Sequence, residues 1–200
     1  MMRPKNHRKE NNGKNLDEFM KIRVLYKLKN IDRISSVGKR KESSAEHSWS
    51  CMILADYLLN NTKRKIDKLR VYELLMYHDV VEIYAGDSPL SPELNHPHQA
   101  KLELASMKKI SKEIPSEIKK GFVSCVEEFE ECRTIEAKFA RAVDALDAII
   151  HELDYKKDWK GWSKNFLRMK KSKYFYDFPE LNEIFEELLI YQEKNGYFDQ

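Results

Sequence analysis

Hydrophobic residues recur along most of the chain at the three- and four-residue spacing of amphipathic helices. The pattern begins at Asp17, breaks between residues 30 and 41, and resumes after Ser43. Helices are then predicted over residues 69–85, 98–113, 116–131, 134–155, 159–169 and from 180 to about 193. No segment has the clear alternation of a β-strand. The pattern predicts one all-α domain of seven or eight helices.

Short polar signals mark where some of these helices begin and end. Ser43-Ser44-Ala45-Glu46 has the form of a capping box, in which Ser43 and Glu46 satisfy free backbone groups at a helix start. Asp67 is placed to cap the third helix, and Gly86 to end it. Asp177-Phe178-Pro179-Glu180 predicts a second capping box before the last helix. The prolines of residues 87–98 predict a loop.

Positive charge is concentrated at the start of the chain. The net charge is +3, but residues 1–15 hold five basic residues and one acidic residue, which leaves −1 for the other 185 residues. We expect a disordered basic arm over residues 1–15 and one domain over 16–200. A solvated tail is favoured over a nucleic-acid contact, and the near-neutral body makes nucleic acid an unlikely partner.

The remaining composition argues for a cytoplasmic protein without a membrane partner. No apolar run approaches the length of a transmembrane helix, and the first residues lack the apolar core of a secretory signal. Three cysteines do not make a disulfide framework and lack zinc-ribbon spacing. We expect Cys51, on an apolar helix face, to be a small buried hydrophobic residue.

Four polar residues fall on helix faces that should pack into the core: His47, His78, Asp79 and Asp144. Burying a carboxylate is costly unless it is paired, hydrogen-bonded or bound to a metal. Two imidazoles and two carboxylates without a thiolate suit a divalent transition ion such as Mn, Fe, Co or Ni. Glu82 lies one turn after His78, within reach of a water molecule at such a site.

The order His … His-Asp … Asp resembles the metal-binding pattern of the HD-domain superfamily of phosphohydrolases. Arg33 and the blocks over residues 42–49, 78–87 and 128–144 look like those of the branch that includes the bacterial 5′-deoxynucleotidases. The similarity extends from about Leu16 to Leu153. It implies a helical HD domain, a divalent metal (Mn, Co, Fe or Ni, with Mg possible) and a homodimer.

The resemblance also implies a role for each site residue. Glu82 would orient or deprotonate the attacking water, Arg33 would contact the substrate phosphate, and Asp87 would lie at the sugar. The branch has Trp directly after this arginine, whereas this chain has Ile34, which puts strict deoxynucleotide selectivity in doubt. The metal would be held by four residues: His47, His78, Asp79 and Asp144.

The resulting hypothesis is a metal-dependent phosphohydrolase that removes phosphate from a small nucleotide, foremost a nucleoside 5′-monophosphate, deoxy or ribo. Two alternatives stay open: hydrolysis of nucleoside di- or triphosphates or nucleotide analogues, and a non-catalytic nucleotide-sensing domain. The basic residues 39–41 precede the capped helix and either assist Arg33 or lie in a solvated loop. His151 is expected to pack or to form a hydrogen bond rather than to bind metal.

Overall fold

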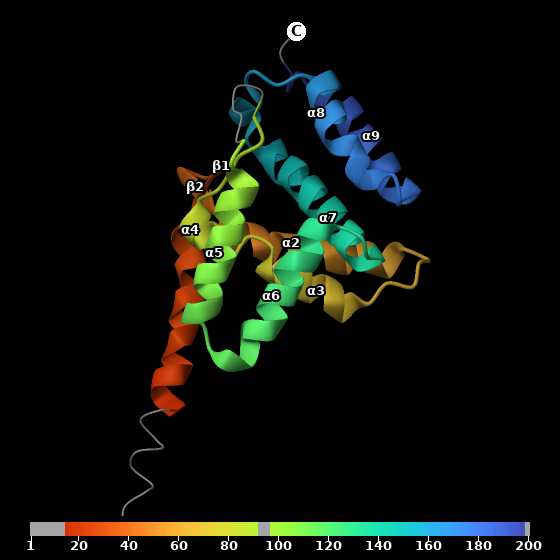
Figure 1. Ribbon diagram of the computed structural model, residues 1–200. Helices are drawn as coiled ribbons and strands as arrows, with labels where there is room; N and C mark the ends of the chain where they lie inside the picture. Colours follow the sequence, from red (N-terminus) through yellow and green to blue (C-terminus); the bar gives the residue numbers. More distant parts are fainter. Residues whose placement is uncertain (1–14, 92–96, 199–200) are drawn as a thin grey trace, which may run out of the picture.

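A computed structural model describes residues 15–91 and 97–198, so the arm predicted over residues 1–15 lies almost wholly outside the described residues. The fold is helical, as predicted (Figure 1). Helical residues 15–20 continue into the 3-10 helix η1 (Lys21–Asn30). The α-helices that follow are α2 (Ser44–Asn61), α3 (Lys68–Tyr77), α4 (Glu82–Ala85), α5 (Gln99–Glu113), α6 (Ser116–Glu131), α7 (Ile135–His151), α8 (Lys164–Lys171) and α9 (Pro179–Lys194). Short 3-10 helices are η2 (Glu152–Asp154), η3 (Lys156–Trp159) and η4 (Ser172–Phe175).

Helix α7 forms the centre of the main core. It packs against α2, α3 and α6, and α8 and α9 lie together beyond it (Figure 1). Alanines at 137, 140, 142 and 145 are all buried on α7 and allow its neighbours to approach closely. Aromatic side chains from the C-terminal segments, including Trp159, Phe178 and Phe185, complete this core. Among the described residues, no helix combines the length and the apolar character needed to cross a bilayer.

A short β-hairpin occupies the segment where the helical pattern breaks. Strands β1 (Asp32–Val37) and β2 (Arg40–Ser43) are antiparallel, and Gly38 turns between them with a φ of 59°. The sequence did not predict these strands because their burial does not follow hydrophobicity: Ser35 and Ser36 are buried, whereas Ile34 is 46% exposed. At the base of the hairpin, the amide of Ser44, the first residue of α2, donates a hydrogen bond of 2.9 Å to the carbonyl of Ile31, which precedes β1.

The prediction of one continuous helix over residues 69–85 is wrong. Helix α3 ends at Tyr77, residues 78–81 form turns, and α4 begins at Glu82. The turns use hydrogen bonds to the third residue back, such as Val80 N to Tyr77 O at 3.1 Å, which tighten the backbone. Gly86 then ends α4 with a φ of 79°, a conformation that other residues rarely adopt.

Two of the three predicted caps are present. Glu46 N bonds the Ser43 side chain while the Glu46 carboxylate accepts from Ser43 N, and Asp67 accepts from Arg70 N. The second capping box, at residues 177–180, is wrong. The residue that caps α9 is Phe178, whose side chain has no hydrogen-bond acceptor. Asp177 instead forms an ion pair with Lys138 at 3.0 Å.

Candidate metal centre and active site

His47 projects from α2 into the core and meets α7. It is 1% exposed, and its two ring nitrogens lie 3.0 Å from Asp144 Oδ1 and 3.0 Å from Asp147 Oδ2. Burial opposes the charge on Asp144, but the hydrogen bond from His47 and the nearby imidazoles hold the pKa of Asp144 well below its usual range. Asp147 was not among the predicted residues, although its position one turn after Asp144 signals a shared face.

His78 and Asp79 lie in the break between α3 and α4. Nδ1 of His78 is 2.8 Å from the Leu75 carbonyl, so it carries the proton and Nε2 keeps its lone pair. Nε2 is buried without a hydrogen-bond partner, 3.2 Å from Asp79 Oδ1, and Asp79 Oδ2 lies 4.0 Å from His47 Nε2. Metal-binding histidines are commonly oriented by a carbonyl in this way. The four predicted ligands therefore converge, and this donor set fits a divalent cation.

Cys51 lies beside the same group without belonging to it. Its sulfur and the ligand atoms of His47, His78 and Asp144 are all within 4.8 Å of one another. However, the sulfur is 3.7 Å from His47 Nδ1 and 3.6 Å from Nε2, which puts it over the ring face, because an in-plane position at these distances would overlap Cε1. The Nε2 lone pair, which would hold an ion, points along the ring plane and away from this sulfur. Burial raises the pKa of Cys51 to about 12, which keeps it a thiol.

Glu82 opens α4 and points to the same region. Ser44, at the start of α2, donates a hydrogen bond of 2.5 Å to its Oε2. Burial raises the pKa of Glu82 to about 9, and the negative charges of Asp79 and Asp87 add to the effect. With this pKa, and without a bound cation nearby, the Glu82 carboxyl holds a proton at neutral pH.

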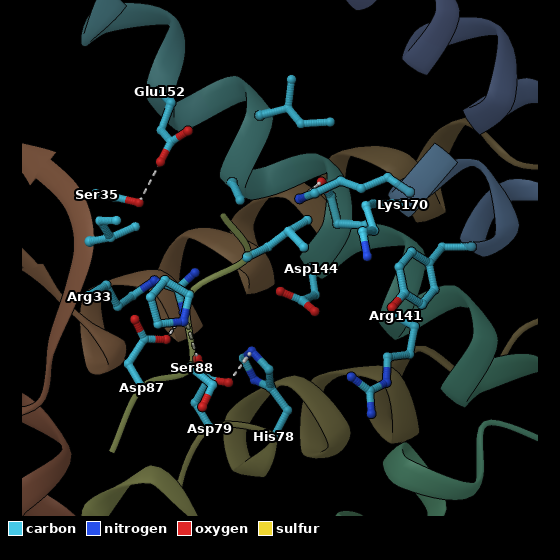
Figure 2. A pocket seen from close by; sticks show the side chains of 18 of the residues that line it. Arg33, Ser35, His78, Asp79, Asp87, Ser88, Arg141, Asp144, Glu152 and Lys170 are labelled. Carbon is cyan, nitrogen blue, oxygen red and sulfur yellow. Dashed lines mark hydrogen bonds and ion pairs between the residues drawn. The ribbon is translucent and has the colours of Figure 1, made fainter. Parts of the chain in front are cut away.

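Arg33 reaches the site from β1. Its Nη1 lies 3.3 Å from Asp79 Oδ2 and 3.9 Å from Asp87 Oδ1 (Figure 2). Its Nε lies 3.3 Å from Glu42 Oε2. Burial raises the pKa of Asp87, although Arg33 opposes this. Glu42 was missed by the sequence interpretation. It is buried on β2, and only the hairpin pairing brings it to Arg33.

A pocket of about 420 Å³ is lined by six of these residues: Arg33, His78, Asp79, Glu82, Asp87 and Asp144. Arg141 and Lys170 lie across Asp144 from Arg33 and Asp87 (Figure 2). The opposite wall consists of residues that the sequence interpretation missed: Arg141, Lys170, Lys171, Lys173 and Tyr174. Arg141 lies one turn before Asp144 on α7, whereas the other four come from α8 and η4, so no local spacing relates those four to the metal-binding pattern.

Residues 39–41 do not line this pocket, so their predicted assistance to Arg33 is not supported. Arg40 instead forms a two-pronged ion pair with Glu46, at 2.8 and 2.5 Å, and Lys41 donates to the Ile34 carbonyl. His151 forms a hydrogen bond of 2.9 Å with the Ser36 carbonyl, in line with its expected structural role.

The arrangement of histidines and aspartates agrees with a comparison against protein families. A model of the HD domain matches residues 25–182, which is most of the chain. The chain belongs to the HD domain family. The match includes every residue discussed above as a candidate ligand or substrate contact.

Similar proteins are known in animals and bacteria. The chain is 27% identical over 189 residues to a Xenopus laevis protein named 5′-deoxynucleotidase HDDC2, covering 92% of this chain and 90% of the relative. It is 29% identical to the 5′-deoxynucleotidase yfbR of Photorhabdus temperata, over 65% of this chain and 70% of the relative. A crystal structure from Magnetospirillum magnetotacticum superposes with a TM-score of 0.81 at 24% identity, covering 92% of this chain and 98% of that one. This last match supports the fold alone.

Proposed function

We propose that this HD domain protein is a metal-dependent phosphohydrolase that removes the 5′-phosphate from a nucleoside monophosphate. The observation that carries the proposal is His78 Nε2, a buried nitrogen without a hydrogen-bond partner beside Asp79, in a pocket that also holds Asp144. The names of the relatives, 5′-deoxynucleotidases, support the substrate class.

A divalent ion would be held by His47, His78, Asp79 and Asp144. When bound, it supplies a Lewis acid that polarises the phosphate and makes water a better nucleophile at neutral pH. Nitrogen and oxygen donors without sulfur favour Mn, Co, Fe or Ni, with Mg possible. His47 is further oriented by Asp147, which holds the ring at the nitrogen directed away from Asp144.

Glu82 is the residue we assign to proton transfer. A nearby cation favours its carboxylate form, which can then accept a proton from the attacking water. The water oxygen bonds to phosphorus while the bond from phosphorus to the 5′ oxygen breaks, and the 5′ oxygen keeps the bonding electron pair and takes up a proton from solvent to leave as the nucleoside hydroxyl. Ser44 fixes the Glu82 carboxylate through its 2.5 Å hydrogen bond.

Arg33 and Asp87 form the wall of the substrate site that faces Arg141 and Lys170 across Asp144 (Figure 2). Arg33 would contact the phosphate, and Asp87 would accept a hydrogen bond from the sugar. Ile34 follows Arg33 in the pocket lining and has no ring to stack on a sugar or base. We therefore expect weaker discrimination between ribose and deoxyribose than strict deoxynucleotidases require.

The test is phosphate release from a panel of ribo- and deoxynucleoside mono-, di- and triphosphates. Protein stripped of metal by a chelator is assayed after addition of Mn, Co, Ni or Mg. Metal-dependent release of phosphate from monophosphates is expected. If pyrophosphate is released, or if phosphate is released only from di- and triphosphates, the substrate is a longer nucleotide and not a monophosphate. If the metal-loaded protein releases no phosphate at all, the proposal is contradicted.

A further inference from the structure

The cations that line the pocket differ in how their charge is balanced. Arg33 is surrounded by Glu42, Asp79 and Asp87 at 3.3 to 3.9 Å. Arg141 pairs with Glu130 at 2.6 Å. Both guanidinium groups are therefore largely neutralised before any substrate binds, and they have limited capacity to balance the charge of a phosphate.

Lys171 differs from these two arginines because no carboxylate among the described residues pairs with it. It is the last residue of α8 and is partly buried, and its Nζ donates to the Ala145 carbonyl at 2.9 Å. Among the described residues, no carboxylate lies within ion-pair distance of this nitrogen. An ammonium group has three donors, so two remain for another partner.

A cation enclosed in this way is unfavourable without a counter-charge. Burial lowers the pKa of Lys171, and the more distant Asp144 and Glu152 only partly offset this. Lys170 and Lys173 lie beside it on the same wall, exposed and likewise without an ion-pair partner among the described residues. The whole wall therefore favours an anion in the pocket.

We propose that Lys171 binds the phosphate of the substrate from the wall opposite Arg33. Its partner Ala145 directly follows Asp144 on α7, so the ammonium lies next to the metal ligands, where a phosphate group would be held. Phosphoryl transfer is accelerated by cations on the phosphoryl oxygens, and a charged hydrogen bond there strengthens in the transition state. The inference rests on the proposed function for its substrate.

A structural role predicts different behaviour. If Lys171 only balanced Asp144 and Glu152, its loss would alter folding stability but leave anion binding unchanged. The matched variants are Lys171→Met, which keeps an unbranched apolar stem but lacks the ammonium group, and Lys171→Arg, which keeps the charge. Lys164→Met is the control, because Lys164 belongs to the same helix but pairs with Glu193 away from the pocket.

The experiment measures binding of inorganic phosphate to metal-loaded protein by calorimetry, together with nucleotide hydrolysis and the melting temperature. Lys171→Met should weaken phosphate binding about tenfold or more and lower kcat/KM by about 10²-fold. Lys171→Arg should recover part of both losses, and Lys164→Met should match the wild type.

Unchanged phosphate affinity in a folded Lys171→Met variant overturns the inference, whatever happens to stability. If the wild type hydrolyses no nucleotide but binds phosphate through Lys171, the proposed function fails and the anion site stands. If nucleotides are hydrolysed equally well by wild type and Lys171→Met, the inference fails and the proposed function stands.

Discussion

Glu82 is buried among other carboxylates, an unusual setting for an acidic side chain. If it transfers a proton in the reaction, Glu82→Gln keeps the size and the hydrogen bond from Ser44 but removes the basic oxygen. We expect kcat to fall by about 10² to 10⁴-fold. Bound metal, measured by elemental analysis, should not change.

Glu103→Gln is the control for this prediction, because Glu103 also lines the pocket but bonds Gln99 rather than a group at the metal centre. An active Glu82→Gln enzyme would remove Glu82 from the chemistry. Loss of metal from the same variant would instead make Glu82 part of the binding site for the ion.

His78 tests the metal site itself. Its Nε2 has no hydrogen-bond partner, so His78→Ala removes the proposed ligand nitrogen and, of the hydrogen bonds of the ring, breaks that of Nδ1 to the Leu75 carbonyl. We expect loss of stoichiometric metal and of activity, with metal content measured on dialysed protein. His98→Ala, at an exposed helix start, should keep both. Full metal retention in His78→Ala would show that the ion is held elsewhere.

Sequence reasoning found residues whose polarity conflicts with a predicted apolar face, and it missed those without such a conflict. His47, His78 and Asp144 stand out in amphipathic patterns, and the structure brings them together. Lys171 gives no signal of this kind, because a lysine near a helix end is ordinary. Its position beside Asp144 results only from the packing of α8 against α7.

Among the elements, α2 depends on its first turn to present His47. The carboxylate of Glu46 accepts from Ser43 N and from Arg40, and these hydrogen bonds, that of Arg40 first, lower the pKa of Glu46 to about 2. A carboxyl group whose pKa is lower in the folded state than in the unfolded state stabilises the fold. This stabilisation is complete at pH values above the unfolded pKa, which for Glu46 is 4.5. That contribution is lost as the pH falls toward 2.

Glu46→Gln should therefore lower the free energy of unfolding by about 0.5–1 kcal/mol at pH 7, a small value because the pair is exposed to solvent. The difference between wild type and variant should disappear between pH 4.5 and 2, as followed by urea unfolding. Glu187→Gln, on an exposed part of α9, should have no effect. A difference that is constant with pH would mean that charge is not the cause.

The break between α3 and α4 shows why boundaries were harder to predict than helices. Apolar spacing continues through residues 78–81, so periodicity alone predicts one helix. The backbone instead turns there, and this allows the adjacent His78 and Asp79 to face the same centre. Adjacent residues on a regular helix point in different directions. The prediction that His78 and Asp79 bind the same ion was therefore the one sequence feature that indicated a break in the helix.

At the scale of the molecule, the site joins the hairpin, α2, the α3–α4 break and α7, with α8 closing the far wall. The helices can be predicted from local patterns, but this meeting of distant segments depends on tertiary packing, which local patterns do not reveal. The two strands were missed for the same reason, since Ser35 is buried by its hydrogen bond to Glu152, 117 residues away. The homodimer implied by the family resemblance stays a prediction.

A centre assembled from distant segments should couple metal binding to global stability. The unfolded chain does not hold these ligands together, so an ion that binds only the folded state stabilises it by an amount set by its concentration relative to Kd. At 100 times Kd this is about 2.7 kcal/mol. For a chain of this size we expect the melting temperature to rise by about 5–10 °C on adding metal to stripped protein. His78→Ala should show almost no rise, whereas Glu103→Gln should behave as the wild type. An equal rise in His78→Ala and wild type would mean that the ion stabilises the protein from another site, and the convergence of His47, His78, Asp79 and Asp144 would then need a different explanation.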